Sequence, residues 1–229
     1  MSMIAIITAR GGSKRIPKKN VKSFMGKPML AYAIEAAKES NLFDEIMVST
    51  DCDEIADVAK KYGAAVPFMR NPQNSDDYAT TFDVLAEVIS KYEAQGKTFD
   101  DICCIYPCVP FLTSKTLKEA YQLMTEKKAD AVLPVCKYPV PIEWAMKMDN
   151  GVLIPNDRKA QCMRSQDLTP KYFDVGMFYF CKTKPMLCEK TVQPANTLGY
   201  VIDESECQDI DTQKDWEMAE TKYKVLRGK

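Results

Sequence analysis

The sequence predicts an α/β protein with a mainly parallel sheet flanked by helices. Residues 3–9 form an uncharged apolar run, which is typical of a parallel strand buried on both faces. Strand-like and helix-like patterns then alternate along most of the chain, as they do in repeated βαβ units. The 229 residues are 46% hydrophobic, which is enough for one sizeable core. We therefore expect a single domain over residues 1–229.

The first half of the chain continues this alternation in order. Pro28 suits the first turn of a helix that reaches about Ser40, and Gly63 suits the end of a second helix. A polar segment, 70–79, contains too many turn formers for a regular element and could be a lid or a ligand loop. The strands expected here are 45–51, 66–69 and 102–106, and the helices are 28–40, 53–62, 80–95 and 114–127.

The second half begins with an expected strand at 131–135, after which the regular alternation of strand and helix patterns ends. Prolines recur between residues 138 and 174, and Asp149-Asn-Gly151 is typical of a turn. We interpret residues 138–175 as an inserted excursion. The core resumes with strands at 177–181 and 200–202, and a last helix spans about 212–225.

Composition narrows the class of function. The formal net charge is −1, so the basic residues near the amino end form a local feature suited to a small anion, which disfavours nucleic acid as a partner. No apolar run approaches membrane-spanning length, and Met1 and Ser2 do not resemble a signal peptide. The nine cysteines lack paired metal or disulfide spacing. We expect a cytoplasmic protein with reduced cysteines and no membrane partner.

The chain contains no histidine. Catalysis by Ser-His-Asp or Cys-His groups, and zinc held by histidine, are therefore excluded. The chemistry that remains uses carboxylates, lysines and hard cations.

The most informative segment is residues 10–20, which follows the first strand directly. Ligands of open α/β sheets bind outside the carboxyl ends of the strands, where this segment lies. Gly11 and Gly12 are expected to adopt positive φ and to turn backbone amides toward an anion. The segment's cations are Arg10, Lys14, Arg15, Lys18 and Lys19. These features predict a polyphosphate site, and a solvated surface turn is the alternative.

Two familiar nucleotide-binding motifs are absent. The chain has no Gly-x-Gly-x-x-Gly sequence, and Gly26-Lys27 is followed by Pro28, so no P-loop forms. A nicotinamide dehydrogenase and a P-loop kinase are therefore excluded.

A pair of carboxylates precedes the last helix, in the segment Gln208-Asp-Ile-Asp-Thr212. In extended backbone, Asp209 and Asp211 share one face while Ile210 packs on the other. Two converging carboxylates suit Mg²⁺, which prefers a few carboxylates together with phosphate oxygens and water. The alternative is that Asp211 or Thr212 caps the helix, with Asp215 completing the cap. Both roles can coexist.

Together these motifs resemble the CMP-sialic acid synthetases, also called acylneuraminate cytidylyltransferases, and the resemblance runs nearly end to end. The matching segments are 9–14 with Lys19-Asn20, the strand end at 48–51, Ser75-Asp76 and 209–211. Within that family, residues 164–167, 172–174 and 208–212 look most like the branch that makes CMP-pseudaminic acid for bacterial surface glycans.

The resemblance implies a Rossmann-like nucleotide-diphospho-sugar transferase fold and a homodimer in which the excursion reaches the partner. It implies that CTP and a nine-carbon 2-keto acid sugar give the CMP-sugar and pyrophosphate, through attack of the anomeric 2-hydroxyl on the α-phosphorus. It also implies Mg²⁺ as cofactor, with Mn²⁺ as a substitute.

The resemblance also implies roles for individual residues. Arg10 and Lys19 act on the departing pyrophosphate and Asp211 on the metal, which makes these three catalytic. The triphosphate loop comprises Arg10, Gly11, Gly12, Ser13, Lys14, Lys19 and Asn20. The cytosine nucleotide is assigned to Arg70 and Ser75, and the metal to Asp209 and Asp211. The sugar is assigned to Tyr106, Arg164, Gln166 and Tyr179.

One departure favours pseudaminic acid over sialic acid as the acceptor. The sialic acid enzymes carry a Gln-x-Thr-Ser-Pro motif that helps to hold the sugar, whereas this chain reads Tyr106-Pro-Cys-Val-Pro110. The alternatives are synthetases of CMP-N-acetylneuraminate, CMP-legionaminate or CMP-ketodeoxyoctonate. More remote alternatives are a metal-dependent glycosyltransferase and a non-catalytic nucleotide-binding protein.

Overall fold

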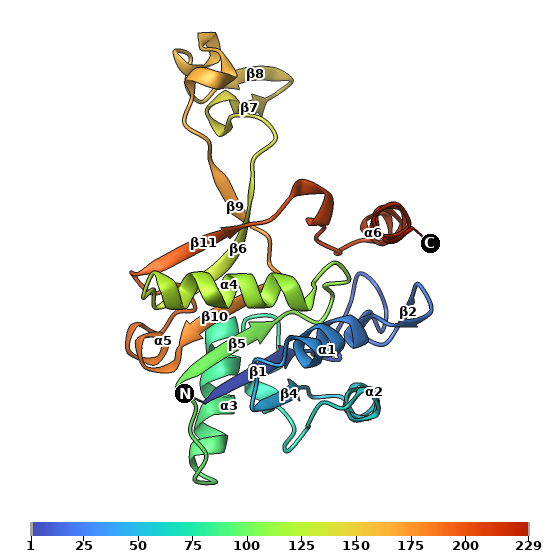
Figure 1. Cartoon of the computed structure of the whole chain (residues 1–229). Coiled ribbons are helices and arrows are strands. Elements are labelled where there is room, and N and C mark those ends of the chain that lie inside the picture. Colours follow the sequence, from blue (N-terminus) through green and yellow to red (C-terminus); the bar gives the residue numbers. More distant parts are fainter. Residues whose placement is uncertain (1, 229) are drawn as a thin grey trace.

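The computed structural model describes residues 2–228, and its core is one seven-stranded sheet with helices on both faces (Figure 1). Six strands follow the order β11–β6–β10–β5–β1–β4, and β9 pairs with β6 beside this path. The strands are β1 (Met3–Thr8), β4 (Glu45–Ser49), β5 (Asp101–Ile105), β6 (Ala131–Lys137), β9 (Tyr172–Asp174), β10 (Phe178–Lys182) and β11 (Thr197–Val201). The α/β class predicted from the sequence is confirmed.

The strand directions are mixed around a parallel core. β1 runs parallel to both β4 and β5, and β11 runs parallel to β6. β10 lies between β5 and β6 and is antiparallel to both, while β9 is antiparallel to β6. The chain leaves the sheet after β6 and returns through the excursion, so that it re-enters in the opposite direction.

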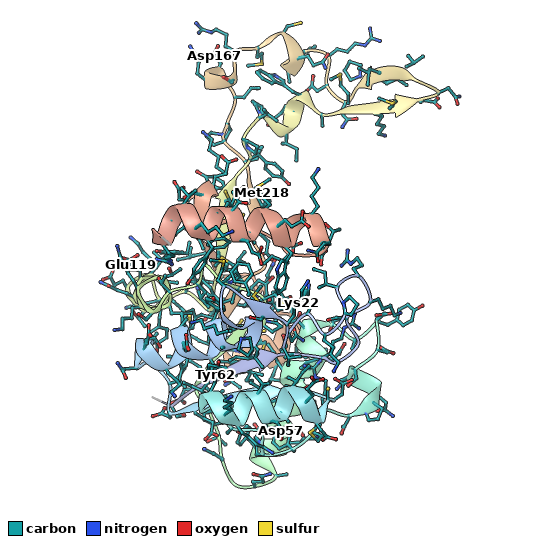
Figure 2. The ribbon with its side chains drawn as sticks, turned by 90° about the vertical axis from the view of Figure 1, so that its right-hand side faces the viewer. Lys22, Asp57, Tyr62, Glu119, Asp167 and Met218 are labelled. Carbon is teal, nitrogen blue, oxygen red and sulfur yellow. The ribbon has the colours of Figure 1, made fainter. Side chains whose placement is uncertain are left out.

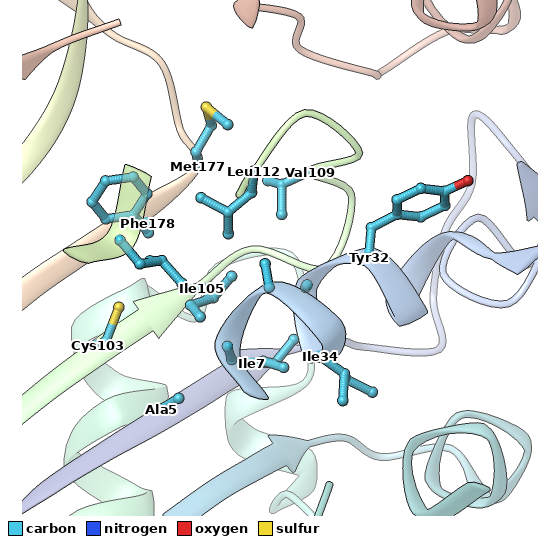
Figure 3. Close-up of a cluster of buried hydrophobic side chains, with 14 of the residues drawn as sticks. Ala5, Ile7, Tyr32, Ile34, Cys103, Ile105, Val109, Leu112, Met177 and Phe178 are labelled. Atoms are coloured by element: carbon cyan, nitrogen blue, oxygen red, sulfur yellow. The ribbon is translucent and has the colours of Figure 1, made fainter. Parts of the chain in front are cut away.

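The helices cover both faces because successive strand residues point to opposite sides. Ala5 and Ile7 of β1 belong to a core cluster that includes residues of α1, α2, α4 and α6 (part of it is drawn in Figure 3). Ile4 and Ile6 belong to a second cluster with residues of α3 and α5. The helices are α1 (Met29–Ser40), α2 (Asp53–Tyr62), α3 (Thr81–Glu93), α4 (Ser114–Glu126), α5 (Thr183–Glu189) and α6 (Gln213–Arg227).

An aromatic cluster attaches α6 to the body of the protein. Phe24 makes edge-to-face contacts with Tyr32, Trp216 and Tyr223, with ring centroids 5.4 to 5.6 Å apart. Phe24 comes from a two-residue strand, β2 (Ser23–Phe24), that pairs with β3 (Lys27–Pro28). Since such aromatic pairs add to ordinary burial, they hold the segment before α6 in place.

The predicted excursion is present and extends away from the sheet (Figure 1). It contains an antiparallel hairpin of β7 (Met146–Asp149) and β8 (Val152–Pro155). Asn150 and Gly151 have φ of 47° and 83°, which confirms the turn predicted there. Short 3-10 helices complete the chain at Pro72–Asn74, Ile142–Trp144, Ala160–Cys162, Ser165–Asp167 and Glu204–Glu206.

One predicted strand is absent from the structure, and one helix was not predicted. Residues 66–69 form no strand, and an isolated bridge between Met47 and Ala65 lies just before them. Pro67 has no amide hydrogen for a ladder, which explains the early end of pairing. Helix α5 was not predicted, because Pro185 reads as a helix breaker although it lies in the first turn, where proline is tolerated. Within residues 2–228, no helix has the length and apolar character needed to cross a bilayer.

Candidate functional site

A cavity of about 780 Å³ opens at the carboxyl ends of β1 and β5. The loop after β1 forms one wall, and the residues after β5 and before β10 form another. Asp209 and Asp211 complete it from the segment before α6. The cavity therefore brings together the basic loop and the carboxylate pair that the sequence singled out.

The basic loop supplies the cavity with Arg10, Gly12, Ser13, Lys14, Arg15, Lys19 and Asn20. Asn20 is buried and its amide donates a 2.9 Å hydrogen bond to the backbone oxygen of Arg10, which ties the two ends of the loop together. Lys18 turns away from this cavity and pairs with Glu54, its Nζ 2.7 Å from Oε2. Four cations thus face the cavity.

The expected role of the two glycines was wrong in one respect. Gly11 and Gly12 are not among the described residues with positive φ, whereas Lys18 is, at 53°. Gly11 is required for space instead, because a Cβ there would lie 2.9 Å from the Cβ of Cys52. Its amide donates a 2.7 Å hydrogen bond to Asp51, so the loop is held against the strand end at 48–51.

Asp209 and Asp211 line the cavity, and Ile210 between them is buried, as predicted from their spacing. The helix cap is made by other residues. Thr212 is the N-cap of α6 and forms a capping box with Asp215. The two possible roles of this segment are therefore divided between different side chains.

The carboxylate pair is electrostatically coupled to the basic loop. The Lys19 ammonium donates a 2.6 Å hydrogen bond to the backbone oxygen of Ile210 and lies 3.7 Å from Asp211. Arg15 lies 2.8 Å from the same carboxylate. Loss of solvent raises the pKa of Asp209, the Asp211 charge raises it further, and Lys19 opposes both effects.

Arg10 and Lys14 are paired with a carboxylate that the sequence did not single out. Asp77, in the loop before α3, places one oxygen 2.9 Å from the Arg10 guanidinium and the other 2.5 Å from Lys14. The hydrogen bonds from Lys14 and Arg10 lower the pKa of Asp77. Only the acidic pair at 76–77 in a polar segment could have indicated this contact.

A smaller cavity of about 230 Å³ adjoins the first and shares Thr8, Arg10, Asp77 and Tyr106 with it. Arg70 lines this cavity, as its assignment to the nucleotide requires. Its guanidinium is buried and donates to the hydroxyl and backbone oxygen of Ser49, at 3.0 and 2.6 Å. Burial lowers the pKa of Arg70, while the nearby Asp51 raises it.

Ser75 lines neither cavity. Its hydroxyl donates a 3.0 Å hydrogen bond to the backbone oxygen of Asn71, which shapes the loop from within. A direct contact of this hydroxyl with a nucleotide would require the loop to change.

Tyr106 and Tyr179 form an aromatic pair, but only Tyr106 lines the cavities. The Tyr106 hydroxyl lies 2.9 Å from the Thr81 hydroxyl, and burial raises the pKa of Tyr106. Tyr179 is buried against it, with its hydroxyl donating to Asp174 at 2.8 Å. Tyr179 therefore supports the wall, a role that the sequence could not distinguish from direct contact.

Arg164 and Gln166 lie on the excursion and do not line the main cavity of the same chain. Figure 2 shows their neighbour Asp167 at the far end of the excursion, well away from Lys22 in the body. Arg164 forms an ion pair with Asp167 at 2.8 Å. Gln166 lines a separate groove between the two chain segments 137–141 and 165–171 of the excursion.

The residues present suit a magnesium ion bound together with phosphate. Asp209 and Asp211 offer two carboxylates in one cavity, next to cations that attract phosphate oxygens. Within residues 2–228, no cluster of three or more cysteine or acidic side chains is arranged to hold a metal by itself. The remaining ligands would therefore come from the substrate and water.

Comparison with known proteins defines the class. The model of the cytidylyltransferase family matches residues 4–221, and the chain belongs to this family. It is 40% identical to a pseudaminic acid cytidylyltransferase of Campylobacter jejuni, over 98% of this chain and 97% of that protein. It is 32% identical to a CMP-N,N'-diacetyllegionaminic acid synthase of Legionella pneumophila, over 96% and 95% of the two chains.

The fold is that of known nucleotidyltransferases. A structure of CMP-2-keto-3-deoxy-manno-octonic acid synthetase, complexed with CTP, superposes with a TM-score of 0.69 at 16% identity. The superposition covers 100% of this chain and 99% of that one. The Rossmann-like α/β fold expected from the sequence is confirmed.

Proposed function

We propose that this protein transfers CMP from CTP to the anomeric 2-hydroxyl of a nine-carbon 2-keto acid sugar, releasing pyrophosphate. The observation that carries the proposal is that four cations meet the carboxylate pair Asp209 and Asp211 in one cavity at the carboxyl edge of the sheet. The names of the Campylobacter and Legionella relatives support this class of reaction. Pseudaminic acid is the acceptor we propose, because the first of these relatives is named for it.

In this proposal the chain acts by positioning and by neutralising charge. Arg10, Lys14 and Lys19 hold the triphosphate so that pyrophosphate can leave in line with the attacking hydroxyl. Arg10 and Lys19 stabilise the charge that develops on pyrophosphate. Asp209 and Asp211 would hold Mg²⁺, and that cation would supply Lewis acidity beside the triphosphate in a chain that has no histidine to act as a base.

We assign the cytosine nucleotide to the smaller cavity beside Arg70. Arg70 is held by Ser49 and remains accessible to that cavity. Because a buried polar group loses much free energy when it is left unpaired, this cavity would discriminate against a base that lacks the right edge. We place the protein in the cytoplasm, where CTP is available and its cysteines stay reduced.

We propose a homodimer built on the excursion. One face of the hairpin exposes apolar side chains that cover nothing in the single chain, including the cross-strand pair Met148 and Leu153, at 72% and 53% exposure. A two-stranded hairpin is marginal alone, and an exposed apolar face of this kind marks an interaction surface. In such a dimer, Arg164 and Gln166 would reach the cavity of the partner chain, and Arg164 would grip the sugar carboxylate.

The test is an assay of pyrophosphate release from CTP. Each nine-carbon acidic sugar is supplied in turn as the acceptor, and so is the eight-carbon ketodeoxyoctonate. We expect turnover with pseudaminic acid to exceed turnover with N-acetylneuraminic or legionaminic acid, and CTP to be preferred strongly over ATP and GTP. Binding of CTP without turnover would indicate a nucleotide sensor, and activity with a nucleotide sugar as donor would indicate a glycosyltransferase. Either result would reject the proposal.

Arg10→Ala and Lys19→Ala test the triphosphate assignment within the same assay. Each should cost on the order of 2 to 4 kcal/mol of transition-state stabilisation, because each removes a charge beside the leaving group. Lys18→Ala is the matched control, since Lys18 belongs to the same loop but pairs with Glu54 outside the main cavity. Equal effects of all three substitutions would show that loop charge in general, and not contact with phosphate, is responsible.

A further inference from the structure

Asp77 occupies the cations that the proposed function assigns to the triphosphate. Its two oxygens lie 2.9 Å from Arg10 and 2.5 Å from Lys14, in the arrangement with which a phosphate group would meet the same side chains. A second nitrogen of Arg10 donates to the backbone oxygen of Asp76 at 2.6 Å. A triphosphate that binds Arg10 and Lys14 must therefore displace Asp77.

The displacement is easy because the pairs are exposed. The side chains of Arg10, Lys14 and Asp77 are 39%, 78% and 48% exposed, and exposed ion pairs contribute little to stability. Lys19 differs, because it is 21% exposed and is held by Ile210 and Asp211. Of the four cations in the cavity, Lys19 is therefore held firmly, whereas Arg10 and Lys14 are loosely held by Asp77.

The same contact links the two cavities. Asp76 and Asp77 line the cavity beside Arg70, and Asp77 also lines the main cavity. Asp76 makes the local turn, since its carboxylate accepts hydrogen bonds from the amides of Tyr78 and Ala79. The Asp77 carboxylate contacts the two cations, so its side chain can exchange partners without dismantling that turn.

We infer that Asp77 is a release residue for the reaction. It pairs with Arg10 and Lys14, gives way to the triphosphate of CTP, and returns to these cations to displace pyrophosphate. This inference rests on the proposed function. It adds that Asp77 competes with the pyrophosphate leaving group for Arg10 and Lys14. No bond is made or broken by Asp77, which acts as a positioning residue through Arg10 and Lys14.

The test is calorimetric titration of inorganic pyrophosphate, without added metal, into wild-type protein and Asp77→Asn. We expect the variant to bind pyrophosphate about three- to tenfold more tightly, because two exposed ion pairs no longer compete. Asp77→Glu keeps the carboxylate and should stay near wild type. Glu54→Gln is the matched control, since it frees a cation of the same loop outside the main cavity and should leave binding unchanged.

A second readout uses turnover. Asp77→Asn should lower KM for CTP and the inhibition constant of pyrophosphate by similar factors, without raising kcat. Unchanged or weaker pyrophosphate binding by Asp77→Asn, in protein that melts like wild type, would overturn the inference. The metal-free titration tests the role of Asp77 even if no acceptor sugar supports turnover. The proposed function is decided separately, by the assay of pyrophosphate release from CTP.

Discussion

At the residue scale, capping of α6 and lining of the cavity are assigned to different residues of the segment 209–215. The sequence alone does not distinguish which residue has which role. Thr212 and Asp215 cap α6, while Asp209 and Asp211 line the cavity. The spacing of the two carboxylates was enough to predict that they converge, because side chains two apart share a face in extended backbone. The identity of the cap depends on where the first helical turn begins, which neighbouring polar residues leave open.

Asp211→Asn tests this division. Because Thr212 makes the cap, we expect the free energy of unfolding to change little, while turnover collapses and partly recovers at high Mg²⁺ or with Mn²⁺. Thermal melts and a metal titration of the same variant provide the two measurements. A fully active Asp211→Asn enzyme would remove this residue from the metal site.

Asp209 allows a second test through pH. Its folded-state pKa is raised above the usual 3.8, so the folded protein holds this proton more tightly than the unfolded chain does. The stabilising contribution of Asp209 is therefore present below the unfolded pKa and is lost as the pH rises through the folded pKa. We expect Asp209→Asn to stabilise the metal-free protein at pH 7, and this difference to shrink as the pH falls toward 4. Urea unfolding of both proteins across this range measures the effect, and an Asp209→Asn protein less stable at pH 7 would contradict it.

At the scale of elements, the spacing of apolar residues in the sequence predicted most of the helices and the parallel core. The helices 29–40, 53–62 and 114–126 lie within a residue or so of their expected bounds. The predictions for residues 66–69 and for α5 failed for the same reason. Each segment contains a proline, Pro67 or Pro185, and the effect of a proline depends on its position within an element. Periodicity also carries no information on direction, so the antiparallel entry of β10 could not be predicted.

The capping box of α6 is an element-scale prediction. Thr212→Ala should cost about 0.5 to 2 kcal/mol of stability, because the amide of Asp215 then loses its partner at the helix start. Thr221→Ala, farther along the same helix, is the control and should be nearly neutral, since alanine favours helix interiors. Denaturant unfolding of both variants decides whether the cap contributes as expected, and equal losses would argue against it.

At the scale of the whole molecule, the cavity joins parts of the chain that lie far apart in sequence. The basic loop and the carboxylate pair at 209–211 were predicted to be parts of the site because each has a local pattern of its own, and both line the main cavity. The pairing of Asp77 with Arg10 and Lys14, and the supporting position of Tyr179, depend on tertiary contacts that no local pattern records. Arg164 and Gln166 do not line the main cavity, because the path of the excursion carries their neighbour Asp167 away from the body (Figure 2).

The excursion carries a prediction about assembly. Met148 and Leu153 face each other across the hairpin and are exposed, so replacing both with Asp should convert the proposed dimer to a monomer. Val225→Asp changes an equally exposed apolar residue on α6 and should leave the dimer intact. Sedimentation velocity distinguishes the outcomes, and a wild-type monomer would reject the dimer directly.

A mixing experiment then asks whether the partner completes the site. Arg164→Ala and Asp211→Asn chains should each be inactive alone, whereas co-refolded mixtures should regain roughly a quarter of wild-type activity through dimers with one intact site. If the mixture forms mixed dimers but stays inactive, Arg164 acts in the site of its own chain or in no site at all.

The hydrogen bond from Lys19 to Ile210 spans 191 residues, which places a constraint on synthesis. A chain growing on the ribosome has its basic loop long before residues 209–211 emerge, and its long-range contacts must wait for them. A product cut short after β11 would keep every strand of the sheet but would lack both carboxylates. Under the metal role proposed for these carboxylates, we expect such a fragment to be inactive, so an interrupted message would yield no partly active enzyme.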